Sequence, residues 1–213
     1  MYRELSVAKL YHCRTSKSEV SRLTGAAPPL PLWPSFFSRW SSEVWPGRRG
    51  LVVREYGMGR FCDPMRWGLP HAPGSPQASE PRITAIWHRD IWRHDPALLG
   101  TDQRCLIILD SFAHADGPSG ARTRTYYGYD DMPIFAWAGV WRQVGRKRGF
   151  AGILVAGADP VEARAMPAIV PPDHYSTWLQ AEVGMPGWNM WRDPNRNLYR
   201  ETTDQPWGRA RWS

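Results

Sequence analysis

The sequence predicts a mixed α+β fold in which strands dominate and helices are few and short. The run 104–112 (RCLIILDSF) is short and rich in Ile and Leu, which fits a buried strand better than a helix. Tyr56-Gly57-Met58-Gly59 joins two strand-like runs in the manner of a hairpin turn.

The first half of the chain is predicted to hold several strands and one capped helix. The strand-like segments are 5–11, 51–55, 60–67 and 83–86. Ser16 or Ser18 can cap a helix over 19–23, and Gly25 can end it because Gly adopts the left-handed conformation at little cost. The segment 26–37 holds four prolines and is expected to be a wrapping loop rather than a helix.

The second half is predicted to pack further strands around the central run 104–112. These strands are 126–129, 134–142 and 150–156. Asp95-Pro96 is placed to begin a helical turn within 90–99, and Asp173 to cap a last helix that ends near Glu182. Turns and loops are expected at 43–47, 70–82, 115–125 and 145–149.

Length and charge suggest a single basic domain. We expect it over residues 5–183, followed by a flexible tail rich in Trp and Arg over 184–213. The net charge of +7 favours a polyanionic partner, nucleic acid first and anionic membrane second, with a basic solvated surface as the plainer alternative. The sequence has no apolar run of roughly 18 residues and no signal-peptide segment, so we expect a cytoplasmic monomer that is not embedded in a membrane.

The three cysteines predict neither disulfides nor a zinc site. Cys13, Cys62 and Cys105 are irregularly spaced and form no CxxC pair. Cys105 lies within an apolar run and is expected to be an inert core residue, as is Cys62. No third metal ligand with suitable spacing accompanies the histidines, so we expect no metal and no cofactor.

Short motifs spread along the chain resemble, in order, those of the SOS response-associated peptidase (SRAP) family, the abasic-site processing proteins. The matching segments are Glu43 to Pro46 with Val52-Val53-Arg54, Arg66 to Pro70, Arg104 to Ile107, Phe135 to Trp141, and Ala165 to Val170. Each motif is short, but their shared order is specific for the fold. The resemblance implies mainly antiparallel sheets that form a barrel-like core with a few peripheral helices.

The same resemblance implies an activity on single-stranded DNA during the response to DNA damage. In the family, an N-terminal Cys uses its thiol and α-amine to capture the ring-opened aldehyde of an abasic site, and the product is a thiazolidine-linked adduct. An Asn, a Glu and a His surround this Cys, transfer protons and hold the sugar. Schiff-base formation needs an unprotonated amine, and release needs a positioned acid or base.

The chain departs from this pattern at the matching positions. The family Cys falls on Ala8, or on Cys13 in a slipped alignment, and neither residue follows the initiator Met. The Asn falls on Ala85, the Glu on His114 and the His on Glu162. Thiazolidine closure needs a thiol beside a free α-amine, so the resemblance implies a scaffold that is kept without the cross-linking chemistry.

The substituted positions still allow a relocated chemistry. If the fold holds, His114 and Glu162 face the same pocket, and such a pair can poise a general base. The plainer alternative, which we favour, is a polar pair that fills the space of the lost site.

Candidate DNA contacts follow from the resemblance and from charge. They are Pro46, Arg66, Trp67, Trp87, Arg89 and Arg164. Pro46 and Trp67 match positions at which the family stacks bases or splays the strand, and a stacked base is worth ~1–3 kcal/mol. Arginine contacts to phosphate give salt-sensitive, sequence-independent binding. The alternatives are core packing for Trp67 and a solvated surface charge for each Arg.

Three functions remain open at this point. The first is a DNA-damage protein that binds single-stranded or abasic-site DNA without cross-linking it. The second is an abasic-site lyase or cross-linker that uses Cys13 or the pair His114 and Glu162. The third is a protein-interaction module that reuses the scaffold.

Overall fold

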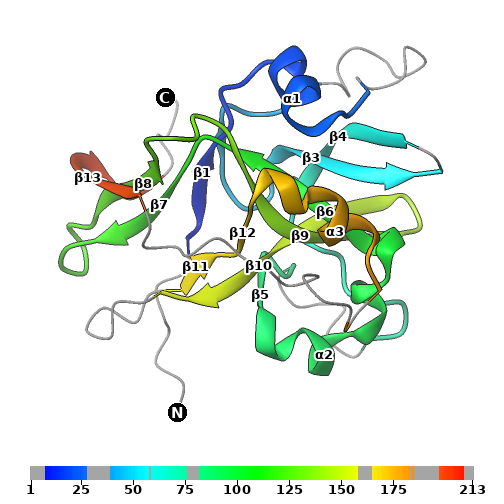
Figure 1. Cartoon of the computed structure of the whole chain (residues 1–213). Helices are drawn as coiled ribbons and strands as arrows, with labels where there is room; N and C mark the ends of the chain where they lie inside the picture. Colours follow the sequence, from blue (N-terminus) through cyan, green and yellow to red (C-terminus); the bar gives the residue numbers. More distant parts are fainter. Residues whose placement is uncertain are drawn as a thin grey trace.

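Two sheets make up most of the computed structural model, which describes residues 8–27, 39–57, 59–75, 82–157, 165–182, 184 and 197–208 (Figure 1). The first sheet has five antiparallel strands in the order β13-β8-β7-β1-β2. Its strands are β1 (Leu10–His12), β2 (Glu43–Val44), β7 (Ser111–Asp116), β8 (Thr123–Tyr129) and β13 (Leu198–Pro206).

The second sheet contains eight strands and closes on itself. Its strands are β3 (Arg49–Tyr56), β4 (Gly59–Trp67), β5 (Ala85–Trp87), β6 (Arg104–Leu109), β9 (Phe135–Val144), β10 (Lys147–Ala156), β11 (Ala165–Pro167) and β12 (Ile169–Val170). Strands β10, β4, β3, β6 and β9 pair in turn, and β9 pairs back to β10, which completes a ring. Only the pairings of β10 with β4 and with β5 are parallel among the described strands.

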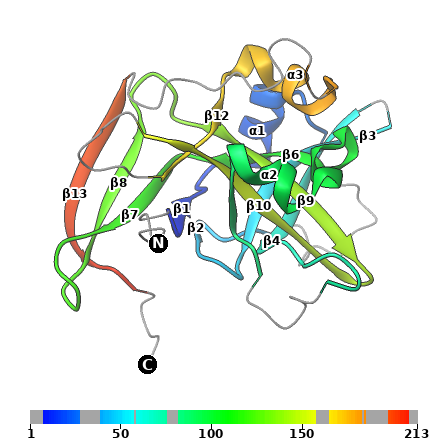
Figure 2. The same ribbon diagram turned by 90° about the horizontal axis from the view of Figure 1, so that it is seen from below.

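The two sheets lie side by side, with β1 between the ring and the outer strands β7, β8 and β13 (Figure 2). The expected mainly antiparallel α+β fold with few helices is therefore confirmed. The barrel-like core takes the form of the closed ring of strands.

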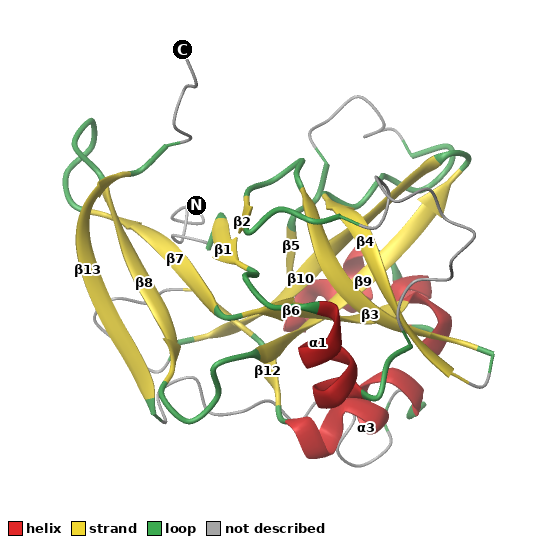
Figure 3. Ribbon diagram, turned by 90° about the horizontal axis from the view of Figure 1, so that it is seen from above, coloured by secondary structure: helices red, strands yellow, loops and turns green. Residues whose placement is uncertain are grey.

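The helices are short and flank the sheets (Figure 3). They are α1 (Lys17–Thr24), α2 (Ile91–His94) and α3 (Tyr175–Gln180). Ser16 caps α1 in a reciprocal capping box with Glu19, and Gly25 ends the helix in the left-handed conformation, as predicted. Asp95 accepts a hydrogen bond from the Ala97 amide, also as predicted.

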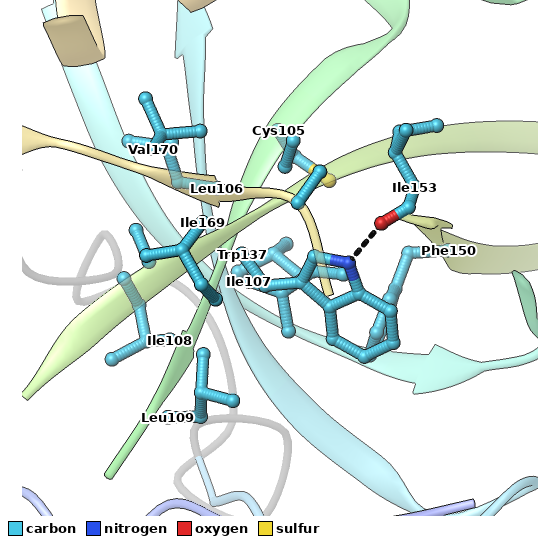
Figure 4. Packing of buried hydrophobic residues seen from close by; sticks show 14 of the residues in the cluster. Cys105, Leu106, Ile107, Ile108, Leu109, Trp137, Phe150, Ile153, Ile169 and Val170 are labelled. Atoms are coloured by element: carbon cyan, nitrogen blue, oxygen red, sulfur yellow. Dashed lines mark hydrogen bonds between the residues drawn. The ribbon is translucent and has the colours of Figure 1, made fainter. Parts of the chain in front are cut away.

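The main core includes side chains from every strand of the ring, and Figure 4 shows the part of it around Trp137. The Trp137 indole lies inside it and donates a hydrogen bond of 2.5 Å to the Ile153 backbone oxygen. Cys105 is fully buried in the same core, which confirms its expected packing role. Arg104, only 1% exposed, donates to the backbone oxygens of Leu99, Trp178 and Ala181. Its guanidinium thereby joins β6 to the end of α3.

Four local predictions are corrected by the structure. The run 104–112 is not one strand, because Asp110 separates β6 in the ring from β7 in the other sheet. The segment expected to be a turn at 43–47 begins with strand β2. Asp173 lies in a 3₁₀ turn and does not cap α3, whose N-cap is His174.

The fourth correction concerns the C-terminal segment. Leu198–Pro206 forms strand β13 and pairs with β8, although the sequence suggested a flexible tail there. Its residues are mostly polar and show no alternation of apolar and polar side chains, so the local sequence pattern does not indicate a strand. The division of the chain at residue 183 remains a prediction.

Candidate functional site

The positions matching the family nucleophile are buried. Ala8 is 1% exposed within the main core, and it carries no nucleophilic group. Cys13 is also 1% exposed, and burial raises the pKa of its thiol well above the ordinary value. A protonated, buried thiol is a poor nucleophile because the thiolate is the reactive form. The slipped alignment to Cys13 therefore provides no accessible thiol.

The other substituted positions lie on both sheets. Ala85 begins β5 and packs partly against the main core. His114 lies on β7 with no exposed surface, where its ring contacts Phe112 and Tyr127 at centroid distances of 5.9 and 5.5 Å. Glu162 lies outside the described residues. The burial of His114 favours the packing interpretation of this residue.

The structure brings Pro46 and Trp67 together at one end of the ring. The Gly47 amide donates to the Trp67 backbone oxygen at 2.7 Å, and the Trp67 amide donates to the Arg48 backbone oxygen at 2.8 Å. Pro46 is half-buried in this turn, whereas Trp67 is 1% exposed. The burial of Trp67 favours the core-packing alternative over base stacking.

Basic side chains surround this turn. Arg66 on β4 is exposed and pairs in register with Arg49 on β3. Arg48, next in the turn, is exposed as well, and Lys147 at the start of β10 is two residues from Gly149, the β10 partner of Arg66. Like charges placed directly opposite one another across strands are destabilising.

A second basic feature lies beyond β5. Arg89 is exposed, and its guanidinium carbon lies 5.0 Å from the ring centroid of the half-buried Trp87. This cation–π contact places an aromatic ring and a cation together at the surface. Proteins use the same combination to bind single-stranded nucleic acids. Arg164, the remaining candidate, lies outside the described residues.

The sequence analysis missed one group of polar residues. Glu43, His12 and Ser111 lie in register on β2, β1 and β7, and we call them the polar row. Their positions are far apart in the sequence and form no local motif, so only the strand pairing brings them together. The sequence did contain one indication, because His12 ends β1 and Ser111 begins β7, and each polar residue lies beside an apolar run.

Two absences can be stated for the part of the chain described above. Within those ranges, no three His, Cys, Asp or Glu residues gather closely enough to hold a metal ion. Among the same residues, no helix has both the length and the apolar character needed to cross a membrane.

Comparisons with known proteins agree with this architecture. The sequence model of the SOS response associated peptidase (SRAP) family matches residues 11–187. Similar solved structures include a protein from Bordetella bronchiseptica (TM-score 0.74, 17% identity, covering 92% of this chain and 99% of that one). A second, from Bacteroides thetaiotaomicron, has a TM-score of 0.74 at 14% identity and covers 91% of this chain and 90% of its own.

A third similar structure is a phage-related protein from Bordetella bronchiseptica. Its TM-score is 0.69 at 16% identity, and the match covers 92% of this chain and 94% of that one. At such identities the structural likeness concerns the fold alone. No curated protein matches the chain.

Proposed function

The chain belongs to the SOS response associated peptidase (SRAP) family, and from this premise we propose that it binds single-stranded or abasic-site DNA in the response to DNA damage without cross-linking it. The carrying observation is the pairing of Arg49 with Arg66 beside the turn at Pro46. Two arginines that are register partners on neighbouring strands can both contact one backbone phosphate.

The loss of cross-linking rests on the substituted positions. Ala8 offers no thiol, and the nearest cysteine in sequence, Cys13, is buried with a raised pKa. Ala85 has no side-chain group to bind or orient a sugar where the family has an amide. A thiazolidine needs a thiol and an amine on one residue, so these substitutions remove the reaction while leaving the surface that holds DNA.

The proposed path of the DNA strand follows from the positions of the arginine and tryptophan side chains. Phosphate contacts come from exposed Arg48 and half-buried Arg49 at the start of β3 and from exposed Arg66 near the end of β4. Trp87, at the end of β5 on the same edge of β10 as β4, and Arg89 beside it supply a platform for a base. In this proposal Trp67 supports the turn from the core rather than stacking on DNA.

The test is incubation of the purified protein with labelled single-stranded DNA, with and without one abasic site. Native and denaturing gels are run side by side at low and at physiological salt. We expect a native shift that weakens with salt. We expect no adduct that survives denaturation and no cleavage of the strand.

The other outcomes would replace this proposal with one of the two alternatives. A denaturation-stable adduct or strand cleavage would support an abasic-site lyase or cross-linker, and His114→Ala and Cys13→Ala would then identify its residues. If no DNA is shifted on the native gel at low salt, the protein does not bind DNA. A protein-interaction module on the same scaffold would then be the better interpretation.

A further inference from the structure

The polar row carries geometry that DNA binding does not use. His12 is the direct register partner of Glu43 on one side and of Ser111 on the other. The Ser111 Oγ lies 3.2 Å from Nδ1 of His12, and the Glu43 carboxylate lies 3.9 Å from Nε2 of the same ring. A hydroxyl, an imidazole and a carboxylate thus stand in one line on one face of the sheet.

This line forms part of a pocket of about 360 Å³. The Tyr126 ring stacks on the His12 ring at a centroid distance of 4.9 Å and an angle of 26°. Strand β13 supplies the opposite side with Tyr199, Glu201, Thr203 and Gln205. Strand β13 lies beyond residues 11–187, the segment that the family model matches.

We propose that this pocket is a second, hydrolytic site, in which Ser111 is the nucleophile, His12 the general base and Glu43 a positioning residue for His12. The Ser111 hydroxyl lies within hydrogen-bond reach of Nδ1 of His12, as a nucleophile and its base require. Glu43, whose carboxylate accepts hydrogen bonds from Trp45 and Arg124, acts on the ring through its charge at 3.9 Å from Nε2. The pocket is small and lined mainly by polar side chains, so its substrate class is an ester with a small acyl group.

Arg14 supplies the positive charge that such a reaction needs. Its guanidinium lies 3.5 Å from the Ser111 Oγ and 2.6 Å from Nδ1 of His12, and it is also paired with Asp110 at 3.1 Å. The Arg14 side chain is 61% exposed, so it can shift toward a substrate carbonyl oxygen and stabilise the oxyanion. That shift leaves Nδ1 of His12 to accept the Ser111 proton.

The protonation state of His12 fits the role of a base. Burial, followed by the Arg14 charge, lowers the pKa of His12, so the ring is neutral near pH 7. Arg14 donates to Nδ1, which requires Nδ1 to carry the lone pair and places the ring proton on Nε2, toward Glu43. In the resting site this lone pair accepts from Arg14, and the Ser111 hydroxyl donates to Asp110 at 3.0 Å. Both hydrogen bonds must therefore break before Ser111 passes its proton to Nδ1.

The reaction balances with water as the second substrate. The Ser111 Oγ forms a bond to the ester carbonyl carbon while its proton moves to Nδ1 of His12. The bond from that carbon to the leaving oxygen breaks, and the alcohol departs with the proton. Water then adds to the acyl group, its proton passes through His12 back to the Ser111 oxygen, and the carboxylic acid is released.

The test uses the full-length protein and a serine-directed fluorophosphonate probe, with the labelled peptide identified by mass spectrometry. We expect covalent labelling of Ser111 and turnover of p-nitrophenyl acetate. Ser111→Ala should abolish both, and His12→Asn should slow turnover by about 100-fold or more, since a general base contributes at least that factor. Ser119, exposed in the loop after β7, is the matched control and should remain unlabelled.

The role of Glu43 has its own readout. Burial, Arg14 and Arg124 lower the pKa of His12. The negative charges of Glu43 and Asp110 raise it. Glu43→Gln should therefore shift the rising limb of the pH–rate profile to lower pH, which a purely structural role would not do. Absence of label on Ser111 in the wild-type protein, or equal labelling of Ser119, would overturn the proposal.

Discussion

The Trp67 indole N–H donates a hydrogen bond of 2.8 Å to the backbone oxygen of Thr84. This bond ties the end of β4 to the segment that enters β5. The Trp67 ring also packs against Tyr11 and Trp137, at centroid distances of 5.2 and 6.0 Å. An aromatic residue that a motif associates with DNA is thus a central packing residue of this ring of strands.

Trp67→Ala should lower the free energy of unfolding by ~3–5 kcal/mol, because it removes a fully buried indole and leaves a cavity. Trp67→Phe should cost less, since the ring remains but the Thr84 oxygen loses its donor. Urea unfolding followed by circular dichroism measures both. A Trp67→Ala variant that keeps wild-type stability but loses DNA affinity would show that the ring acts at the surface after all.

Local chemistry made several features predictable from the sequence. The capping box at Ser16, the cap at Asp95 and the hairpin turn at Gly145 each depend on residues a few positions apart. Such signals act within one turn, so the sequence contains them directly.

Features that depend on long-range pairing were not predictable. Strand β13 is held by β8, about 70 positions earlier, and its own residues lack strand periodicity. Asp110 redirects the chain from one sheet to the other, and the apolar run gives no sign of that change. The polar row arises in the same way, from register between distant segments. The pairing of Arg49 with Arg66 instead follows from the hairpin of β3 and β4.

The thiols provide a direct test of the relocated-nucleophile alternative. All three cysteines are buried, and burial raises the pKa of the Cys62 thiol to about 11. The pKa values of Cys13 and Cys105 are raised further in the same direction. Ellman's reagent at pH 8 should therefore find no reactive thiol in the folded protein and three after unfolding in guanidinium. Rapid modification of Cys13 in the native state would revive it as a nucleophile.

Arg66→Glu should weaken DNA binding and make it less sensitive to salt. Each phosphate contact to single-stranded DNA contributes a slope of about 0.7 in log affinity against log salt, so the slope should become shallower by ~0.7–1.4. Fluorescence anisotropy with a labelled oligonucleotide between 50 and 200 mM salt measures it. Arg22→Glu changes the net charge equally on α1 and should leave the slope unchanged. Equal effects of both variants would indicate nonspecific attraction rather than a phosphate site.

His12 should contribute a pH dependence of stability. Its pKa is lowered from the ordinary 6.5 by burial first and by Arg14 second, with Arg124 acting in the same direction and Asp110 and Glu43 opposing. Below pH 6.5 the unfolded chain binds the His12 proton more readily than the folded chain. Stability is therefore lost as the pH falls from 6.5 toward the lower folded pKa, and it is retained above 6.5.

His12→Gln should reduce this loss, so the thermal midpoint should fall less between pH 7 and pH 5 than in the wild type. Differential scanning calorimetry of the two proteins measures the difference. His88, whose pKa burial also lowers, is present in both proteins and cancels in the comparison. Parallel midpoint curves for the two proteins would mean that His12 is not desolvated in the native state.

Strand β13 depends on a glycine that leaves room for an aromatic ring. Gly128 on β8 is the register partner of Tyr199, and a Cβ at Gly128 would lie 2.5 to 2.6 Å from atoms of the Tyr199 ring. Gly128→Val should displace that ring and destabilise β13 by ~1–3 kcal/mol, the usual range for overpacking. Amide hydrogen exchange should then accelerate across 198–206.

The double variant Gly128→Val with Tyr199→Ala separates this steric cause from a general effect on β8. Removing the ring relieves the clash, so the double variant should recover much of the amide protection that Gly128→Val loses. Tyr199→Ala alone should lose only the packing of the ring on the sheet face. If the two substitutions add without recovery, the ring does not lie over Gly128, and the pocket that Tyr199 helps to line would need a different wall.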